Sequence, residues 1–108
     1  MNRPVDDLRE LGRFSEPALL ILISLADGPK HGYAMTEDIA QIAGQRLGPG
    51  TLYGAITRLE ARGWIAPLPS DDRRRPYKLT SAGHGVLKHR LNALRAMERA
   101  ARSRLAPS

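Results

Sequence analysis

Three consecutive arginines, Arg73 to Arg75, form the densest run of charge in the sequence. They stand in the turn SDDRRRP, between two short runs, WIAPLP and YKLT, whose composition predicts strands. A guanidinium presents a planar fork of donors that matches phosphate oxygens, so arginines at a hairpin tip favour contact with a phosphate backbone. Asp71 and Asp72 precede them; these acids could be simple turn formers, and they also neutralise part of the tip.

An amphipathic pattern precedes the hairpin, within GPGTLYGAITRLEARGWI from Gly48 to Ile65. Its apolar residues recur at i, i+4 and i+7 and should share one buried helical face: Leu52, Ile56 and Leu59. The opposite face is small, carries hydroxyls and has a single arginine: Tyr53, Gly54, Thr57, Arg58 and Ala61. Phosphates would repel bulky acids on such a face, and close approach to a groove would be blocked. We interpret the segment as a DNA recognition helix; periodicity alone also fits an ordinary surface helix.

A helix followed at once by a basic hairpin is typical of the winged helix-turn-helix. The loop from Gln45 to Gly50 lacks the glycine spacing of a Walker or dinucleotide phosphate-binding loop. A loop that orients the next helix is the better interpretation. Thr51 is expected to cap that helix, whose N-terminal N–H groups and dipole then favour a phosphate. In the hairpin, Trp64 and Ile65 should face the core, and the prolines at 67 and 69 indicate a sheet edge.

Two helices should support the recognition helix. Ser15 is expected to cap the first, Glu16 to Ala26, which is apolar nearly all round and therefore central. The second should run from about Gly32 to Ala43, and Gly44 should end it. Its candidates for burial are Tyr33, Met35, Ile39, Ile42 and Ala43. Before these helices, a weak helical segment from Val5 to Leu11 should either fray or pack on a partner.

The last predicted helix runs from Ala82 to about Leu105, after a cap at Thr80 or Ser81, and is about 36 Å long. Its apolar positions form a stripe that the small domain cannot cover: Leu87, Leu91, Leu94, Met97, Ala101 and Leu105. We therefore expect it to pack on a second copy of the chain; a lone projecting helix is the alternative.

Composition limits the alternatives. The chain has 108 residues, enough for one domain, no cysteine and a formal charge of +6. Ten of its 17 basic residues lie in 70–108. Phosphate contact and a solvated tail explain the arginines of the last helix equally well. The longest apolar stretch, Pro17 to Ala26, is far shorter than the roughly 20 residues that span a bilayer, and no signal peptide is evident. We expect a soluble, cytoplasmic protein.

Catalytic and metal-binding chemistry finds little support. His31 has no His or carboxylate at ligand spacing, so a local hydrogen bond in the first helical turn is the better interpretation. His84 and His89 are five residues apart, which on a helix separates them by about 140°. Without cysteine, a credible histidine–carboxylate pair or a phosphate loop, we expect no enzyme, no cofactor and no metal site.

The chain resembles the PadR family of bacterial transcriptional regulators over roughly 19–87. Three pieces carry the resemblance, in the family's order and spacing: LLILISLADGPKHGYAM, GPGTLYGAITRLEARGWI and DDRRRPYKLTSAG. The resemblance implies a repressor that binds a palindromic operator as a homodimer through a winged helix and a C-terminal dimerisation helix. The helix that begins at GTLY would enter the major groove. The implied contact positions are Thr51, Tyr53, Gly54, Thr57 and Arg58, with Arg73, Arg74 and Arg75 in the wing.

Two features depart from the family. Gly54 stands where many members have proline after the tyrosine. Some members of the smaller subgroup bind planar aromatic effectors through an aromatic of the last helix, but this chain has no Phe, Tyr or Trp from Ala82 onward. That mode of binding therefore does not carry over to this chain, and release from DNA by another small-molecule effector is a further hypothesis.

These observations predict a mainly α (α+β) fold: a winged helix-turn-helix with a two-stranded β wing and a long C-terminal dimerisation helix. We expect an N-terminal arm or short helix over 1–14, a DNA-binding domain over 15–80 and a dimerisation helix with a short tail over 81–108. The expected partners are double-stranded DNA and a second copy. The alternative function is a winged-helix protein-interaction module without specific DNA binding.

Overall fold

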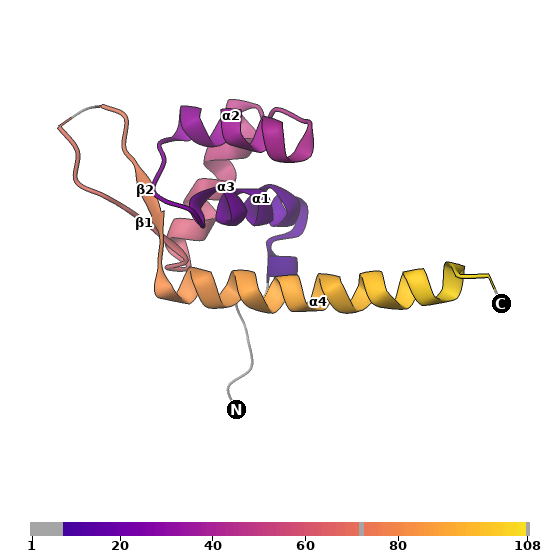
Figure 1. The fold of residues 1–108 in the computed structure, drawn as a ribbon. Coiled ribbons are helices and arrows are strands. Elements are labelled where there is room, and N and C mark those ends of the chain that lie inside the picture. Colours follow the sequence, from indigo (N-terminus) through magenta and orange to yellow (C-terminus); the bar gives the residue numbers. More distant parts are fainter. Residues whose placement is uncertain (1–7, 72, 108) are drawn as a thin grey trace.

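The computed structural model describes residues 8–71 and 73–107. Its elements follow one another as η1 (Leu8–Phe14), α1 (Ser15–Leu25), α2 (Gly32–Ala43), α3 (Pro49–Ala61), β1 (Ile65–Pro67), β2 (Tyr77–Leu79) and α4 (Ser81–Leu105). Figure 1 shows α2, α1 and α4 stacked above one another, with the β1–β2 hairpin at one side. The mainly helical fold with a two-stranded wing and a long last helix is the predicted one.

Helix α1 is the centre of the core. Eight of its eleven residues are apolar, Pro17 included, and Ile21 and Leu22 are fully buried. It contacts η1, α2, α3, α4 and β2, so residues around its whole circumference find apolar neighbours. The prediction of a central helix is confirmed, although the helix begins at Ser15 and has no side-chain cap.

The segment before α1 differs from its prediction. Residues 8–14 form a 3-10 helix that is kinked at Gly12 (φ 60°), and its Leu8, Leu11 and Phe14 are buried against α1 and α3 of the same chain. The prediction that this segment frays or needs a partner was therefore wrong for its described part. The reason is that α1 and α3 leave an apolar face that these three residues cover. Val5, where the predicted segment begins, lies outside the described residues.

Helix α2 has the predicted limits. The ring nitrogen Nδ1 of His31 accepts a hydrogen bond from the N–H of Ala34 (3.4 Å), and Gly44 ends the helix in a left-handed conformation (φ 70°). Met35 and Ile39 are buried as expected. The burial predicted for Tyr33, Ile42 and Ala43 was wrong: Tyr33 in the first turn is 65% exposed, and Ile42 and Ala43 in the last turn are exposed too. These side chains point to different sides of α2, whereas the side that packs into the core is that of Met35 and Ile39.

Helix α3 begins earlier than predicted. Its N-cap is Gly48 and Pro49 occupies its first turn, where the missing N–H costs nothing and the fixed φ suits a helix. Thr51 therefore lies inside the helix and does not cap it.

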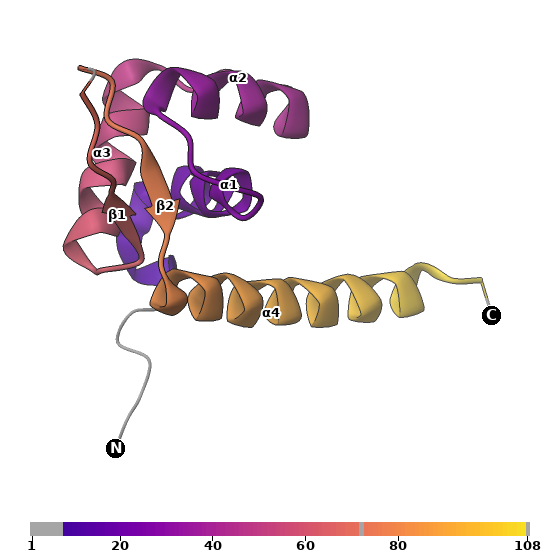
Figure 2. The same ribbon diagram turned by 60° about the vertical axis from the view of Figure 1, so that its left-hand side comes forward.

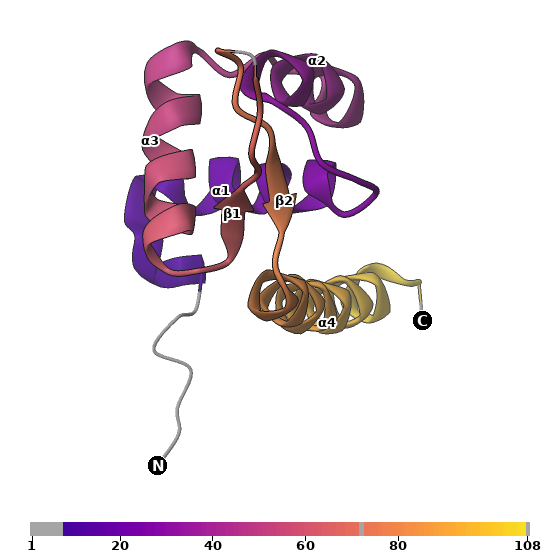
Figure 3. The same cartoon turned by 90° about the vertical axis from the view of Figure 1, so that its left-hand side faces the viewer.

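The wing is a two-stranded antiparallel sheet in the register Ile65↔Leu79, Ala66↔Lys78 and Pro67↔Tyr77. On its other side, Tyr77 forms a bridge with Lys30, whose N–H donates to the carbonyl of Tyr77 (3.1 Å). Trp64 and Ile65 are each 1% exposed, which confirms their predicted place in the core. Figure 3 shows α3 and the wing side by side, with α4 below them.

Helix α4 begins at a confirmed cap, because the N–H of Gly83 donates to Oγ1 of Thr80 (3.0 Å). Leu87 is buried in the core of the domain. Beyond it, the helix leaves the domain and extends away from it (Figures 1 and 2). No helix among residues 8–71 and 73–107 is long and apolar enough to cross a membrane.

Candidate nucleic-acid interface

Helix α3 has the two faces that its sequence predicts. Leu52, Ile56 and Leu59 are at most 2% exposed, and Ala55 joins them in the core. The proposed contact residues Thr51, Tyr53, Thr57 and Arg58 are all exposed, whereas Gly54 is half-buried. The outward face of α3 is thus accessible at these four residues, as a helix that enters a groove requires.

Thr57 lies in the middle of this face. Its hydroxyl donates a hydrogen bond to the main-chain carbonyl of Tyr53, one turn earlier (2.8 Å). The proton is therefore engaged within the helix, and the side chain presents an acceptor oxygen and a methyl group outward. Those groups suit a base-edge donor and the methyl group of thymine.

Gly54 faces a neighbour within the domain. A β-carbon on Gly54 would lie 2.7 Å from Cε1 of Phe14, so the ring from η1 rests directly on the helix backbone. Contact between Gly54 and DNA stays a prediction. The structure does show why a residue larger than glycine would disturb the site.

Arg58 lies beside the same ring. Its Cζ is 3.9 Å from the centroid of Phe14, and its Nη1 donates to the carbonyl of Gly54 (3.2 Å). Tyr53 and Arg58 are five residues apart and so point about 140° from each other around the helix. Arg58 therefore borders the outward face on the η1 side, and Tyr53 borders it on the wing side.

Tyr53 links α3 to the start of α2 and to the wing. Its hydroxyl lies so close to Gly32 that a β-carbon there would overlap it. A cleft of about 260 Å³ joins the three elements; its walls are His31, Gly32, Tyr33, Tyr53, Arg73, Arg74, Arg75 and Tyr77. The fold thus brings the predicted α3 face and the predicted wing arginines into one surface.

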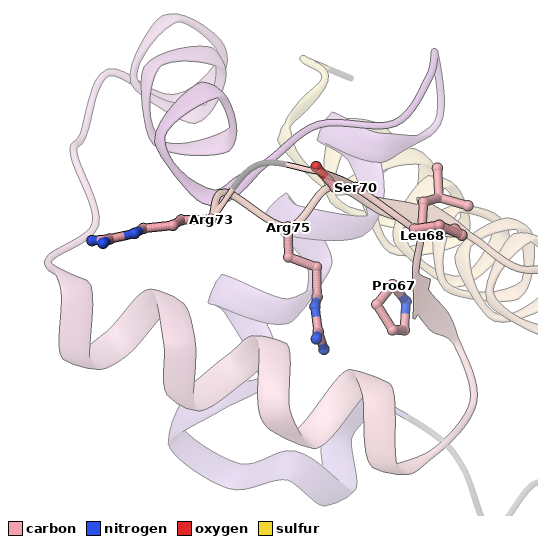
Figure 4. A pocket seen from close by; sticks show the side chains of 6 residues that line it. Pro67, Leu68, Ser70, Arg73 and Arg75 are labelled. Atoms are coloured by element: carbon pink, nitrogen blue, oxygen red, sulfur yellow. The ribbon is translucent and has the colours of Figure 1, made fainter.

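The three wing arginines are exposed. In Figure 4, Arg75 extends from the wing toward α3, whereas Arg73 extends sideways from the turn. Arg73 and Arg75 also line a hollow of about 490 Å³ with Pro67, Leu68, Pro69 and Ser70. Asp71 is exposed beside them, and Asp72 lies outside the described residues.

Tyr77, the first residue of β2, lines the cleft together with Tyr53 of α3. Partial burial, followed by the negative charge of Glu60, raises the pKa of its phenol above the ordinary value of 10.0, while Arg75 opposes that shift. Tyr77 therefore stays a neutral hydrogen-bonding group at physiological pH. Its backbone is fixed on both sides by Pro67 and Lys30.

His31 serves as the cap of α2, as expected from its place in the first turn. In the part of the chain that the structure describes, no three His, Cys, Asp or Glu residues are grouped to hold a metal ion.

The predicted dimerisation residues divide into two sets. Leu87 is buried in the core of its own domain, and its contact with a partner stays a prediction. Leu91, Met97 and Leu105 are 44%, 55% and 82% exposed, and Ala101 is also exposed. Leu94 is half-buried. An apolar stripe therefore continues along the projecting part of α4.

Sequence reasoning missed three residues of this surface. The ring of Phe14 contacts the guanidinium of Arg58, but nothing in the local pattern of 8–14 indicates a contact with α3. Tyr33 borders the cleft and not the core, and its polar phenol in the first turn of a helix is the sequence feature that indicates this. Tyr77 was treated only as part of a strand.

Comparison with known proteins gives a consistent result. The model of the transcriptional regulator PadR-like family matches residues 21–89. The chain is 37% identical over 87 residues to transcriptional regulator Rv3488 of Mycobacterium tuberculosis. The match covers 75% of this chain and 78% of that protein.

A second relative is much longer than this chain. The chain is 46% identical over 82 residues to a 37.1 kDa protein of transposon TN4556 from Streptomyces fradiae; the match covers 76% of this chain but only 24% of that protein.

Among solved structures, a PadR family transcription regulator from Clostridium difficile R20291 superposes with a TM-score of 0.74 at 23% identity. That match covers 83% of this chain and 98% of the other. At this identity the likeness concerns the fold.

Proposed function

Since the chain belongs to the PadR-like family of transcriptional regulators, we propose that it is a sequence-specific repressor that binds a palindromic operator as a homodimer. In this proposal, residues 15–80 contact DNA and residues 81–108 join the two copies. The observation that carries it is the single surface on which the outward face of α3 meets Arg73, Arg74 and Arg75, with Tyr53 between them.

The two groups of residues have different tasks. The wing arginines contact phosphates and supply affinity that depends on salt but hardly on sequence. Thr51, Tyr53, Gly54, Thr57 and Arg58 enter the major groove, where donors and acceptors of the base edges distinguish the four base pairs. Repression follows because the occupied promoter is closed to other proteins.

The dimer sets the spacing of the half-sites. The stripe of Leu91, Leu94, Met97, Ala101 and Leu105 packs against the same stripe of a second copy, which removes an exposed apolar face from water. Two recognition helices then face consecutive turns of the duplex, about 34 Å apart. A planar effector between the two α4 helices would find no Phe, Tyr or Trp on them to stack against.

A salt titration tests the proposal against a protein-interaction module. Binding to random duplex DNA should fall steeply as salt rises, because bound phosphates release counterions. Absence of binding at ordinary salt would favour the interaction module.

Alanine variants then separate the two tasks. Thr57→Ala and Arg58→Ala should relax the preference for particular base pairs, whereas Arg74→Ala should weaken binding to every sequence alike. Equal losses on specific and random DNA for all three variants would contradict the assignment of the α3 face.

A further inference from the structure

The side chain of Arg58 is held by two contacts before any DNA arrives. Its guanidinium carbon lies 3.9 Å from the centroid of the Phe14 ring, within the range of a cation–π contact. Its Nη1 donates to the carbonyl of Gly54 (3.2 Å). A surface arginine normally samples many rotamers, and these contacts select one of them.

The Phe14 ring that supports Arg58 is itself buried. Phe14 is 8% exposed, and its ring lies directly on Gly54, where a β-carbon would come 2.7 Å from Cε1. The ring comes from η1, outside the helix-turn-helix itself. The position of the arginine therefore depends on a residue about 40 positions earlier in the chain, through contacts that only the folded domain provides.

A guanidinium stacked on an aromatic face keeps its in-plane N–H groups available. Arg58 has five N–H donors, one of which is used by Gly54, so two parallel donors can still face outward. Guanine offers the matching pair of acceptors, O6 and N7, in the major groove. Holding the side chain in place beforehand reduces the conformational entropy that is lost when it binds.

We propose that Phe14 is a positioning residue for DNA recognition: it holds Arg58 at the edge of the α3 face so that the guanidinium reads a guanine. This inference rests on the proposed DNA-binding function. It adds the N-terminal segment η1 to the determinants of sequence preference, although Phe14 itself does not touch the DNA.

The test compares variants on two duplexes, the sequence enriched from a random library and a random control. Phe14→Leu keeps an apolar side chain but removes the π face, and Phe14→Tyr keeps both. We expect Phe14→Leu to reduce the preference for the enriched duplex by about threefold to tenfold, and Phe14→Tyr to retain it. Arg13→Ala is the matched control, because Arg13 also approaches the Phe14 ring (4.9 Å) but lies outside α3. It should change affinity for both duplexes alike.

A double-mutant cycle assigns the effect to the contact. Once Arg58→Ala has removed the guanidinium, adding Phe14→Leu should cause no further loss of preference. A further loss of the same size as in the wild type would overturn the inference, as would an equal effect of Phe14→Leu on both duplexes. Thermal unfolding of each variant is measured as a control, and the domain should stay folded under the binding conditions.

The stacking itself is measurable without DNA. The ring current of Phe14 should shift the side-chain proton resonances of Arg58 upfield, and Phe14→Leu should abolish the shift. If the shift is present but the preference does not depend on Phe14, the positioning role fails and the proposed DNA binding stands. If the wild type prefers no duplex, the proposed function fails and this inference fails with it.

Discussion

The main-chain carbonyl oxygen of Trp64 lies where a β-carbon on Gly83 would stand. The same oxygen accepts a hydrogen bond from the N–H of Thr80 (3.0 Å). The residue before β1 and the first turn of α4 are therefore locked together through backbone atoms. This junction fixes the direction in which α4 leaves the domain, and with it the geometry of any dimer built on that helix.

Substitution of Gly83 should destabilise the domain. In Gly83→Ala the new methyl group meets a backbone oxygen that cannot move without breaking its own contact, so we expect a loss of about 1–3 kcal/mol in the free energy of unfolding. Gly85→Ala is the matched control, because nothing lies within 4 Å of its β-carbon position. It should gain up to about 1 kcal/mol from better helix propensity. Urea unfolding measures both, and equal stability of Gly83→Ala and the wild type would contradict the account.

Removal of a wing charge should weaken DNA binding without changing its selectivity. We expect Arg74→Ala to lower affinity for specific and random duplexes by the same factor and to reduce the slope of log K against log salt by about one. Arg99→Ala on α4 removes the same charge far along the projecting helix. If both variants reduce the slope of log K against log salt equally, the effect comes from net charge and the proposed phosphate contacts of the wing are contradicted.

A charge on the apolar stripe of α4 should separate the two copies. Leu91→Glu places a carboxylate in the proposed interface twice, once from each copy, and should weaken the dimer by about 100-fold or more. Ala96 lies five residues further on, about 140° around the helix, so Ala96→Glu adds the same charge to the opposite side. Sedimentation equilibrium should show monomers for the first variant and dimers for the second. Identical behaviour of the two variants would speak against the proposed stripe.

The contact between α2 and the loop before α3 should make stability depend on pH. Hydrogen bonds from Arg46 (2.5 and 3.2 Å) hold the pKa of the Glu37 carboxyl below its ordinary value of 4.5. Because the folded pKa is the lower one, the stabilisation is present above pH 4.5 and is lost as the pH falls through the folded pKa. Both side chains are largely exposed, so the effect is small.

Arg46→Gln should therefore have a lower urea midpoint than the wild type at pH 7, and the two midpoints should converge as the pH falls from 5 toward 3. A difference that stays constant over that range would show that Arg46 acts through packing and not through its charge.

Much of the fold follows from local patterns in the sequence. The apolar run of α1, the i, i+4, i+7 pattern of α3 and the cap at Thr80 each specify a structure within a few residues, and the structure contains all three. The start of α3 differs from its prediction because Pro49 favours the first helical turn, so the helix begins before the hydroxyl of Thr51 could cap it.

Long-range contacts could not be predicted in this way. Periodicity indicates that one side of a helix is apolar, but it does not indicate whether another element covers that side. It therefore could not predict that Tyr33 is exposed or that Leu87 is buried in the core of its own domain. The place of Phe14 on Gly54 depends on the path of residues 8–14 across α3, and no spacing within either segment encodes it.

The most direct test of the central claim is the selection of bound duplexes from a random library by the wild-type protein. The account predicts one enriched palindrome whose half-sites lie about one helical turn, or 34 Å, apart. Recovery of unenriched sequences, or of a single motif without a symmetric partner, would contradict it.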